Sequence, residues 1–347
     1  MIVTRFHNLE KLAFDVEFLS PTFLGGADQH AELRSAPFKN LLRQWWRVAN
    51  GHRSASDLRK IEGELFGTVL GDNSAQASQV RLVLEKGKIF SIANKLPNLQ
   101  PRLNHPNVKV PVDRLLYLGY GPISKITRDF ITPGSVVNIA IYIKKSTTEM
   151  FEKTISLLHH FGTIGSRSRN GFGSISLNIK NKIQLSSLPQ LIKENISFAD
   201  RMKQENKTYP AQLCLDEKNL LCWEYMPDNP IDVKKAWQEI LHNFAEIYMK
   251  TRTQFKFTAK NELEARHLLG YPAGQNHVVA GWGSRMPSQL RLMVKRNEQE
   301  QIVGRILHLA HPIPKKWDNK LGAQTDIWKK VHSFLDGQPS LKRCGGV

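Results

Sequence analysis

The order of strand-like and helix-like segments around one glycine-rich run limits the fold of this chain more than any other feature. Segment 12–19 alternates apolar and polar residues, which is the pattern of a half-buried strand. The segments that follow are, in chain order, helices at 36–50 and 57–66, strands at 80–84 and 136–143, a helix at 148–161, the glycine-rich run at 162–174 and a strand at 172–179. This succession predicts a split βαβ, ferredoxin-like unit.

The second half of the chain repeats the same outline more weakly. Its segments are a strand at 220–225, a long helix at 232–251, strands at 290–294 and 302–309, and a helix at 325–335. With 347 residues there is room for two domains. We therefore predict an α+β chain with two tandem ferredoxin-like (RRM-like) domains and loop insertions. The predicted limits are 1–183 and 184–336, with a flexible tail at 337–347.

The charge balance favours a polyanionic partner. The formal net charge is +18, and no apolar run reaches the ~20 residues that span a bilayer, so nucleic acid is favoured over membrane. The amino terminus lacks a signal-peptide pattern, and the three cysteines match no disulfide or zinc spacing. These features predict a cytoplasmic protein without a cofactor.

The glycine-rich run carries the pattern of a phosphate-binding loop. It combines four glycines with two arginines and interleaved hydroxyls. Glycine allows close backbone approach, successive N–H groups form an anion nest, and arginine grips phosphate bidentately. The candidate RNA contacts are Gly165, Arg167, Ser168, Arg169 and Gly171. The alternative is an ordinary turn with two solvated arginines.

The helix predicted at 36–50 has a basic face opposite its apolar face. That basic face is free of Asp and Glu along the helix, so an external anion is the simplest counter-charge. The candidate RNA contacts here are Arg34, Lys39, Arg43, Trp46 and Arg47, with the indole stacking on a base or sugar. The alternative is a solvated basic face with Trp46 in a neighbouring core. A glycine-rich turn at 281–287 adds Arg285 as a weaker candidate.

Catalytic signals are sparse in the sequence. His159 and His160 precede the glycine-rich run and offer a general base for metal-independent RNA cleavage. Acidic residues are scattered, and no nucleotide-hydrolysis or metalloprotease motif is present. The proline-rich excursion at 97–133 interleaves basic and aromatic residues, which suits single-stranded nucleic acid, although such residues are also commonly just solvated.

Four stretches together resemble the RAMP superfamily of CRISPR-associated proteins. They are FLSPTFLGGAD at 18–28, AELR at 31–34, FKNLLRQWWR at 38–47 and GSRSRNGFGS at 165–174. Within the superfamily they are most similar to the first-numbered subunits of type III-B Cmr effector complexes. The resemblance is good over roughly residues 10–180 and covers the second half in outline. Members commonly carry arginine where this chain has Asn170.

The resemblance implies a non-catalytic, RNA-binding subunit of an RNA-guided antiviral ribonucleoprotein. It implies contact with CRISPR RNA near its 3′ end and with target RNA, and other RAMP subunits as protein partners. Two alternatives stay open at this point. One is a metal-independent endoribonuclease of the same superfamily that processes guide RNA. The other is a scaffold whose basic faces meet acidic protein partners.

Overall fold

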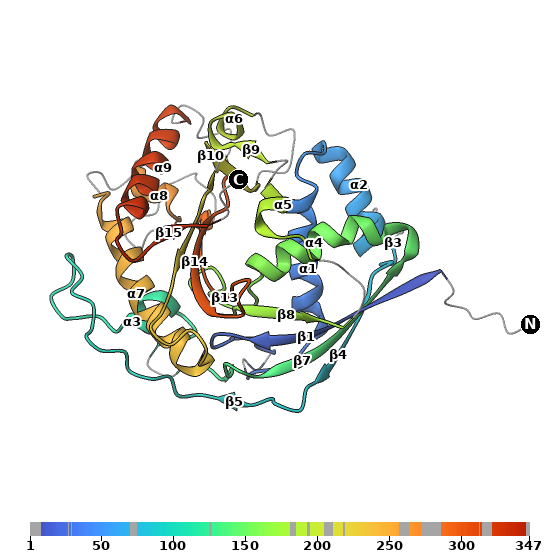
Figure 1. Ribbon diagram of the computed structural model, residues 1–347, viewed down its shortest axis with the longest axis horizontal. Helices are drawn as coiled ribbons and strands as arrows, with labels where there is room; N and C mark the ends of the chain where they lie inside the picture. The colour runs from blue at the N-terminus through green and yellow to red at the C-terminus, as the bar shows by residue number, and fades with distance from the viewer. Residues whose placement is uncertain are drawn as a thin grey trace, which may run out of the picture.

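The computed structural model shows a chain with two four-stranded sheets, each covered by helices on one face (Figure 1). It describes residues 8–26, 28, 30–69, 75–124, 127–180, 185–192, 195–204, 211–217, 219–256, 264–271, 286–311, 313 and 321–344. Everything below concerns these residues.

The first sheet gathers four strands from the amino-terminal half in the order β4-β7-β1-β8, with every neighbouring pair antiparallel. The elements of this unit are β1 (Leu9–Phe18), α1 (Ser35–Ala49), α2 (Ala55–Phe66), β4 (Arg81–Lys86), β7 (Val136–Lys144), α4 (Thr148–Phe161) and β8 (Ile175–Ile179). A short hairpin of β2 (Thr68–Val69) and β3 (Ala75–Gln76) follows α2, and a 3-10 turn at Lys145–Thr147 precedes α4. By position in the chain, the four main strands lie in the order second, third, first, fourth.

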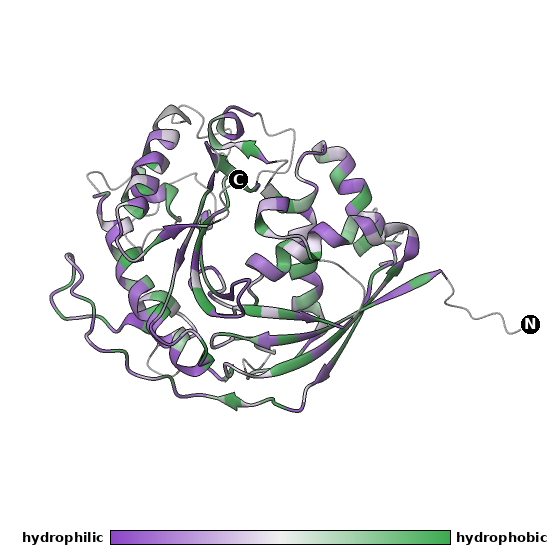
Figure 2. Ribbon diagram, viewed as in Figure 1, coloured by the Kyte–Doolittle hydropathy of each residue, from purple (hydrophilic) through white to green (hydrophobic). Residues whose placement is uncertain are grey.

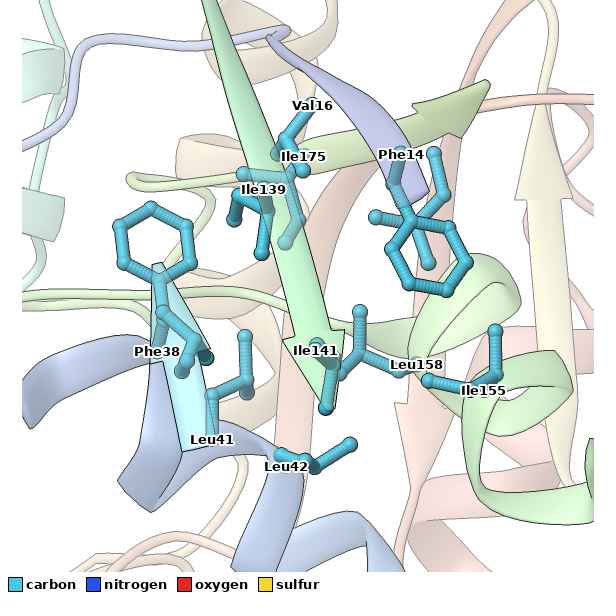
Figure 3. Close-up of a pocket in the computed structure, with 12 residues that line it drawn as sticks. Phe14, Val16, Phe38, Leu41, Leu42, Ile139, Ile141, Ile155, Leu158 and Ile175 are labelled. Carbon is cyan, nitrogen blue, oxygen red and sulfur yellow. The ribbon is translucent and has the colours of Figure 1, made fainter. Parts of the chain in front are cut away.

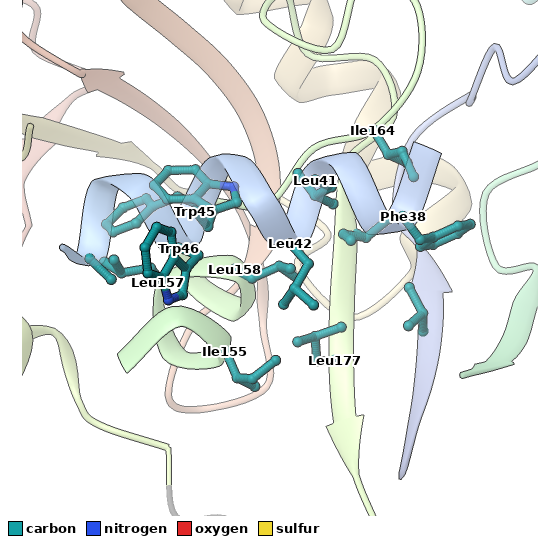
Figure 4. Close-up of a cluster of buried hydrophobic side chains, with 14 of the residues drawn as sticks. Phe38, Leu41, Leu42, Trp45, Trp46, Ile155, Leu157, Leu158, Ile164 and Leu177 are labelled. Atoms are coloured by element: carbon teal, nitrogen blue, oxygen red, sulfur yellow. The ribbon is translucent and has the colours of Figure 1, made fainter. Parts of the chain in front are cut away.

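Alternation of side chains along the strands builds the core of this unit. Leu12, Phe14 and Val16 of β1 are buried, while the residues between them are partly exposed. Figure 2 shows the same alternation of apolar and polar residues along the strands. Helices α1 and α4 cover the buried face, and their leucines and tryptophans pack together in Figure 4. The predicted strand and helix order of the first half is therefore observed.

A small apolar void lies between the first sheet and its two helices. Its volume is about 30 Å³, and aliphatic and phenylalanine side chains line it, among them Phe14, Phe38 and Ile155 (Figure 3). Because no polar group faces this space, it is a packing void of the core rather than a ligand site.

The second sheet has the order β13-β14-β12-β15, again antiparallel throughout. Its elements are β12 (Cys222–Tyr225), α7 (Val233–Thr253), α8 (Ala265–Leu268), β13 (Leu290–Arg296), β14 (Ile302–His308), α9 (Leu321–Asp336) and β15 (Lys342–Arg343). The strands again lie in the order second, third, first, fourth. The two halves of the chain thus share one topology.

The prediction of a loose tail after Gly337 was wrong for residues 338–344. β15 pairs with β12, and Leu341 is buried. The guanidinium of Arg343 lies 4.2 Å from the centre of the Trp223 ring and bonds the carboxylate of Asp336. The polar composition of the segment concealed a short edge strand that these side-chain contacts hold in place.

Two connecting regions complete the chain. Between the units lie α5 (Leu188–Ile192), β9 (Ile196–Ser197), α6 (Phe198–Lys203), β10 (Cys214–Asp216) and β11 (Asn219–Leu220), whose strands form a separate small sheet. The proline-rich excursion contains α3 (Arg114–Gly119) and β6 (Phe130–Ile131), and β6 pairs with β5 (Ile92–Ala93), which lies just before the excursion. It crosses to the second unit, where Arg114 is 3% exposed and donates to the carbonyl of His242 on α7 (2.7 Å). Arg114 therefore holds the excursion in place and is not available to RNA.

Candidate nucleic-acid interface

The glycine-rich loop between α4 and β8 divides into two arms with different surroundings. The first, residues 165–168, is open to solvent, and we call it the groove arm. The second, residues 169–174, becomes buried from Gly171 onward, and we call it the junction arm. The predicted phosphate-binding loop therefore exposes only part of its length.

Backbone pairing ties the junction arm to the second unit. The N–H of Gly171 donates to the carbonyl of Leu292 on β13 (2.9 Å), and the N–H of Leu292 donates to the carbonyl of Arg169 (2.8 Å). Ser174 Oγ accepts from the N–H of Val294 at 2.9 Å. These bonds leave Gly171 no access to a ligand, so its prediction as an RNA contact was wrong.

A buried lysine fastens the same junction. Nζ of Lys295 on β13 donates to the carbonyls of His159 (3.0 Å), Gly162 (2.7 Å) and Ile175 (2.7 Å). Two of these carbonyls lie at the end of α4, where a cation complements the helix dipole. The ammonium therefore joins the end of α4, the loop and β8 to the second sheet.

An open groove runs between the groove arm and the first half of α1. It has a volume of about 480 Å³. Its polar lining comes from Arg34, Asn40 and Gln44 on one side and from Ser166 and Ser168 on the other. The backbone of Gly165 forms part of the wall, and a Cβ there would lie 2.6 Å from the carbonyl oxygen of Phe23. Glycine is required at this position because the loop backbone passes so close to the 21–25 turn.

A second hollow continues the groove toward the second unit. It has a volume of about 270 Å³ and shares Gln44 with the first. Its cationic lining consists of Arg47, Arg169 and Arg291, with His311 and Ser288 beside them. The guanidinium of Arg291 lies 5.4 Å from the centre of the Trp45 ring, which forms the floor. None of the described residues that line either hollow is acidic.

The basic residues of α1, Lys39, Arg43 and Arg47, form a cationic stripe that points elsewhere than the sequence predicted. Arg43 and Arg47 both bond the carboxylate of Glu62 on α2, which packs beside α1. Burial alone would raise the pKa of Glu62, but the hydrogen bonds from Arg47 and Arg43 hold it below its usual value. The counter-charge that the sequence argument assigned to an external anion therefore comes from the next helix.

The individual stripe residues divide accordingly. Arg43 and the partly exposed Lys39 do not line the groove, whereas Arg47 lies at the boundary and lines the second hollow. Burial, and then the charge of Arg43, lower the pKa of Lys39. The stripe therefore does not line the groove as one wall, because α1 turns a different, amide-bearing face toward the glycine-rich loop. Contact of Lys39, Arg43 and Arg47 with RNA stays a prediction.

The prediction that Trp46 stacks on RNA was also wrong. Its side chain is 0% exposed and meets the Phe66 ring edge-on, with 6.1 Å between ring centres. Trp45, expected in the core, is indeed buried and stacks on Phe161 (5.9 Å). In Figure 4, Trp46 points from α1 toward Leu157, and Trp45 lies on a different side of the same helix.

The two loop arginines diverge. Arg169 lines the second hollow, and its Nη1 donates to the carbonyl of Ser288 at 3.3 Å. Arg167, with φ of 57°, places its guanidinium about 3.5 Å from where a Cβ of Gly121 would lie, away from the groove. Asn170, at the position where arginine is common in the family, donates to the carbonyl of Leu118 (2.8 Å) and so holds the loop against α3.

Arg34 and Arg285 complete the account of the predicted contacts. Arg34 lines the groove, donates to the carbonyl of Gly25 and lies 3.6 Å from the Glu32 carboxylate. Arg285 lies outside the described residues. The sequence analysis missed Gln44, Arg291 and His311. Among them Arg291 left a signal, because it interrupts an otherwise apolar strand.

The two histidines proposed as general bases lie in the junction. Burial first, then the charges of Lys295 and Arg305, lower the pKa of His159 to about 4. Burial first, then His159 and Arg305, lower that of His160 to about 3. Both are therefore weak bases, and neither lines the groove. The described residues contain no group of three side chains suited to hold a metal ion.

Comparison with known proteins identifies the first unit. The RAMP superfamily model matches residues 15–176, which include the end of β1, α1, α4 and the glycine-rich loop. This part of the chain is similar to the RAMP superfamily. The resemblance predicted from the sequence is confirmed.

Individual relatives extend the likeness over the whole chain. The CRISPR system Cmr subunit Cmr1-2 of Pyrococcus furiosus is 23% identical over 197 residues, which cover 50% of this chain and 97% of that protein. The crystal structure of Cmr1 from Pyrococcus furiosus in its apo form matches with a TM-score of 0.52 and 17% identity, covering 97% of this chain and 99% of that one. A chain of the type III-B Cmr-beta complex bound to cognate target RNA matches with a TM-score of 0.49 and 11% identity, covering 93% and 100%. No described helix is both long and apolar enough to cross a membrane.

Proposed function

We propose that this chain is a non-catalytic RNA-binding subunit of a type III-B CRISPR Cmr effector complex. The observation that carries the proposal is the continuous groove between the glycine-rich loop and α1. Arg34 lies at one end, and Arg47, Arg169 and Arg291 lie at the other, with amides and hydroxyls between them. The similarity to Cmr subunits indicates that the polyanion bound in this groove is CRISPR RNA near its 3′ end and target RNA.

The topology supports the finer description of the fold. Both sheets place their strands in the order second, third, first, fourth, with a long helix (α1 or α7) directly after the first strand and another (α4 or α9) after the third. This is the connectivity of the ferredoxin-like βαββαβ unit. The chain is thus two tandem ferredoxin-like domains, the first ending near residue 183 and the second extending through β15.

The groove is built to hold a strand by its backbone. Its cations suit phosphate, and its amides and hydroxyls suit ribose. Both tryptophans of α1 are buried, so they supply no stacking platform. Such a site distinguishes bases poorly. In an RNA-guided complex the sequence is read by guide–target pairing while the protein holds the strand.

The functional setting follows from this proposal. The chain works in the cytoplasm, next to other RAMP subunits, and cleavage of the target belongs to those neighbours. The weak basicity of His159 and His160, and their position away from the groove, argue against the endoribonuclease alternative.

Sequencing of bound RNA tests the proposal. The tagged full-length chain is expressed with its native CRISPR array, and the RNA that co-purifies is sequenced. We expect guide RNAs bearing repeat-derived tags, enriched over an Arg169→Ala/Arg291→Ala variant. If guide RNA made up the same fraction of the co-purified RNA as of total cellular RNA, the proposal would be contradicted. A time course with purified guide and target RNA should show no cleavage by the chain alone.

A further inference from the structure

The outermost strand of the first sheet has one edge that no described residue pairs with. β4 pairs with β7 on one side and is the last strand of the sheet on the other. In Figure 1 it lies at the side of the first sheet that is farthest from β8 and the second unit. An exposed strand edge presents N–H and C=O groups that favour pairing with another strand.

The register shows which residues direct their backbone groups outward. Gly87, next to β4, donates its N–H to Val136 and so occupies a hydrogen-bonded site of the ladder with β7. Residues of the same parity, Arg81, Val83 and Glu85, therefore bond β7. Leu82 and Leu84 direct their N–H and C=O groups toward the free edge.

The sequence of this edge is complementary to itself. Residues 81–85 read Arg-Leu-Val-Leu-Glu, which is symmetric about Val83 in shape and opposite in charge at its ends. Arg81 and Glu85 are exposed, and the described residues offer neither an ion-pair partner. Leu82 and Leu84 are half-buried and pack against the edge of the core.

We propose that β4 pairs antiparallel with β4 of a second copy of this chain, with the two-fold axis at Val83. In this register Leu82 faces the partner's Leu84 in a hydrogen-bonded site, so the outward N–H and C=O groups of both residues are satisfied. Arg81 faces the partner's Glu85 at a non-hydrogen-bonded site, where side chains approach more closely. The two-fold axis repeats each of these contacts.

Self-complementarity is the reason for choosing a second copy as the occupant. A two-fold interface must match a surface to itself, and a one-residue shift of this strand would place leucine opposite charge. A phosphate backbone does not suit this edge, because Glu85 and two leucines flank the outward groups. The pairing leaves the RNA groove open, because the groove lies beside α1 and the glycine-rich loop.

The dimer is expected to be weak and reversible. A contact of this length buries less surface than a standard interface, which corresponds to a Kd of roughly 10–100 µM. The charge of +18 on each copy opposes association, so moderate salt assists it. Sedimentation equilibrium of the full-length, RNA-free chain from about 1 to 500 µM in 0.3 M salt measures this range.

Charge reversal gives the decisive arms of the experiment. Arg81→Glu and Glu85→Arg should each weaken self-association about tenfold or more, because each sets two like-charged pairs opposite one another. A 1:1 mixture of the two variants should form a heterodimer, and the double variant Arg81→Glu/Glu85→Arg should associate as the parent does. Lys60→Glu, on the exposed side of α2, is the matched control and should change nothing.

Amide exchange adds a readout that does not depend on any variant. The N–H groups of Leu82 and Leu84 should gain protection as the protein concentration rises, while those of Val83 and Glu85 are protected throughout. A chain that is monomeric over the whole range would overturn the proposal. So would a dimer that survives Arg81→Glu and Glu85→Arg separately, since another surface would then hold it.

Discussion

The two arms of the glycine-rich loop use the same composition for opposite purposes. In the groove arm, Gly165 lets the backbone pass close to Phe23 while Ser166 and Ser168 face the open groove. In the junction arm, Gly171 and Gly173 let the backbone enter a space filled by Leu241 and Ile164. One arm is shaped for a ligand and the other for the second unit. Composition alone does not distinguish these roles.

The largest expected effect is on the junction arm. Gly173 has φ of +66°, and a Cβ there would lie 1.7 Å from the carbonyl oxygen of Ile164. Gly173→Val should therefore lower the free energy of unfolding by more than about 4 kcal/mol or prevent folding. Denaturant unfolding measures it. Ser168→Ala in the groove arm is the control and should stay within about 0.5 kcal/mol. A Gly173→Val protein as stable as the parent would contradict the structural role assigned to the junction arm.

Removing the lysine of the junction should come next in size. Lys295→Met keeps the length of the side chain but leaves three buried carbonyls without their donor. We expect a loss of about 3 kcal/mol in unfolding free energy. The control is Lys180→Met. The ammonium of Lys180 is half-exposed and pairs with Asp15, so its loss should lower the free energy of unfolding by at most about 1 kcal/mol. If both variants lowered the unfolding free energy equally, Lys295 would contribute no more to stability than an exposed lysine.

Acid should loosen the junction before the groove. The folded-state pKa values of His159 and His160 lie at about 4 and about 3, below the usual 6.5. Between pH 6.5 and these lower values, the unfolded chain therefore binds more protons than the folded chain. Their contribution to stability is therefore complete only well above pH 6.5 and declines as the pH falls, by about 3 kcal/mol at pH 5.5 from these two residues. Unfolding curves of His160→Asn should show a shallower decline between pH 6.5 and 4. An unchanged slope would contradict the burial of this imidazole.

The smallest effects on stability, and the clearest on binding, belong to the groove. Arg34→Ala should weaken single-stranded RNA binding about fivefold to tenfold while leaving unfolding within about 0.5 kcal/mol. Arg43→Ala, on the α2-facing side of the same helix, should leave RNA affinity nearly unchanged and instead cost stability by removing one of the two arginine partners of the buried Glu62. Fluorescence anisotropy with a labelled RNA checks both. A larger loss of RNA affinity in Arg43→Ala than in Arg34→Ala would instead support the RNA-binding stripe predicted from the sequence.

The sequence predicted the order of elements well because periodicity survives in every long segment. Leu12 to Phe18 and the apolar face of α1 appear where the pattern placed them. It failed where a partner distant in the chain decides the outcome. Glu62 on α2 bonds Arg43 and Arg47, and Phe66 on the same helix packs against the buried Trp46. β15 was missed because Lys342 and Arg343 resemble a polar tail until Asp336 and Trp223 are placed beside them.

The salt dependence of RNA binding tests the central claim most directly. The Arg169→Ala/Arg291→Ala variant removes two cations from the second hollow, and Arg43→Ala removes one from outside it. If the groove holds the RNA backbone, the log–log slope should fall by about 1.4 in the double variant, at about 0.7 for each lost phosphate contact, and stay unchanged in Arg43→Ala. An unchanged slope in the folded double variant, or a fall in Arg43→Ala alone, would contradict the account.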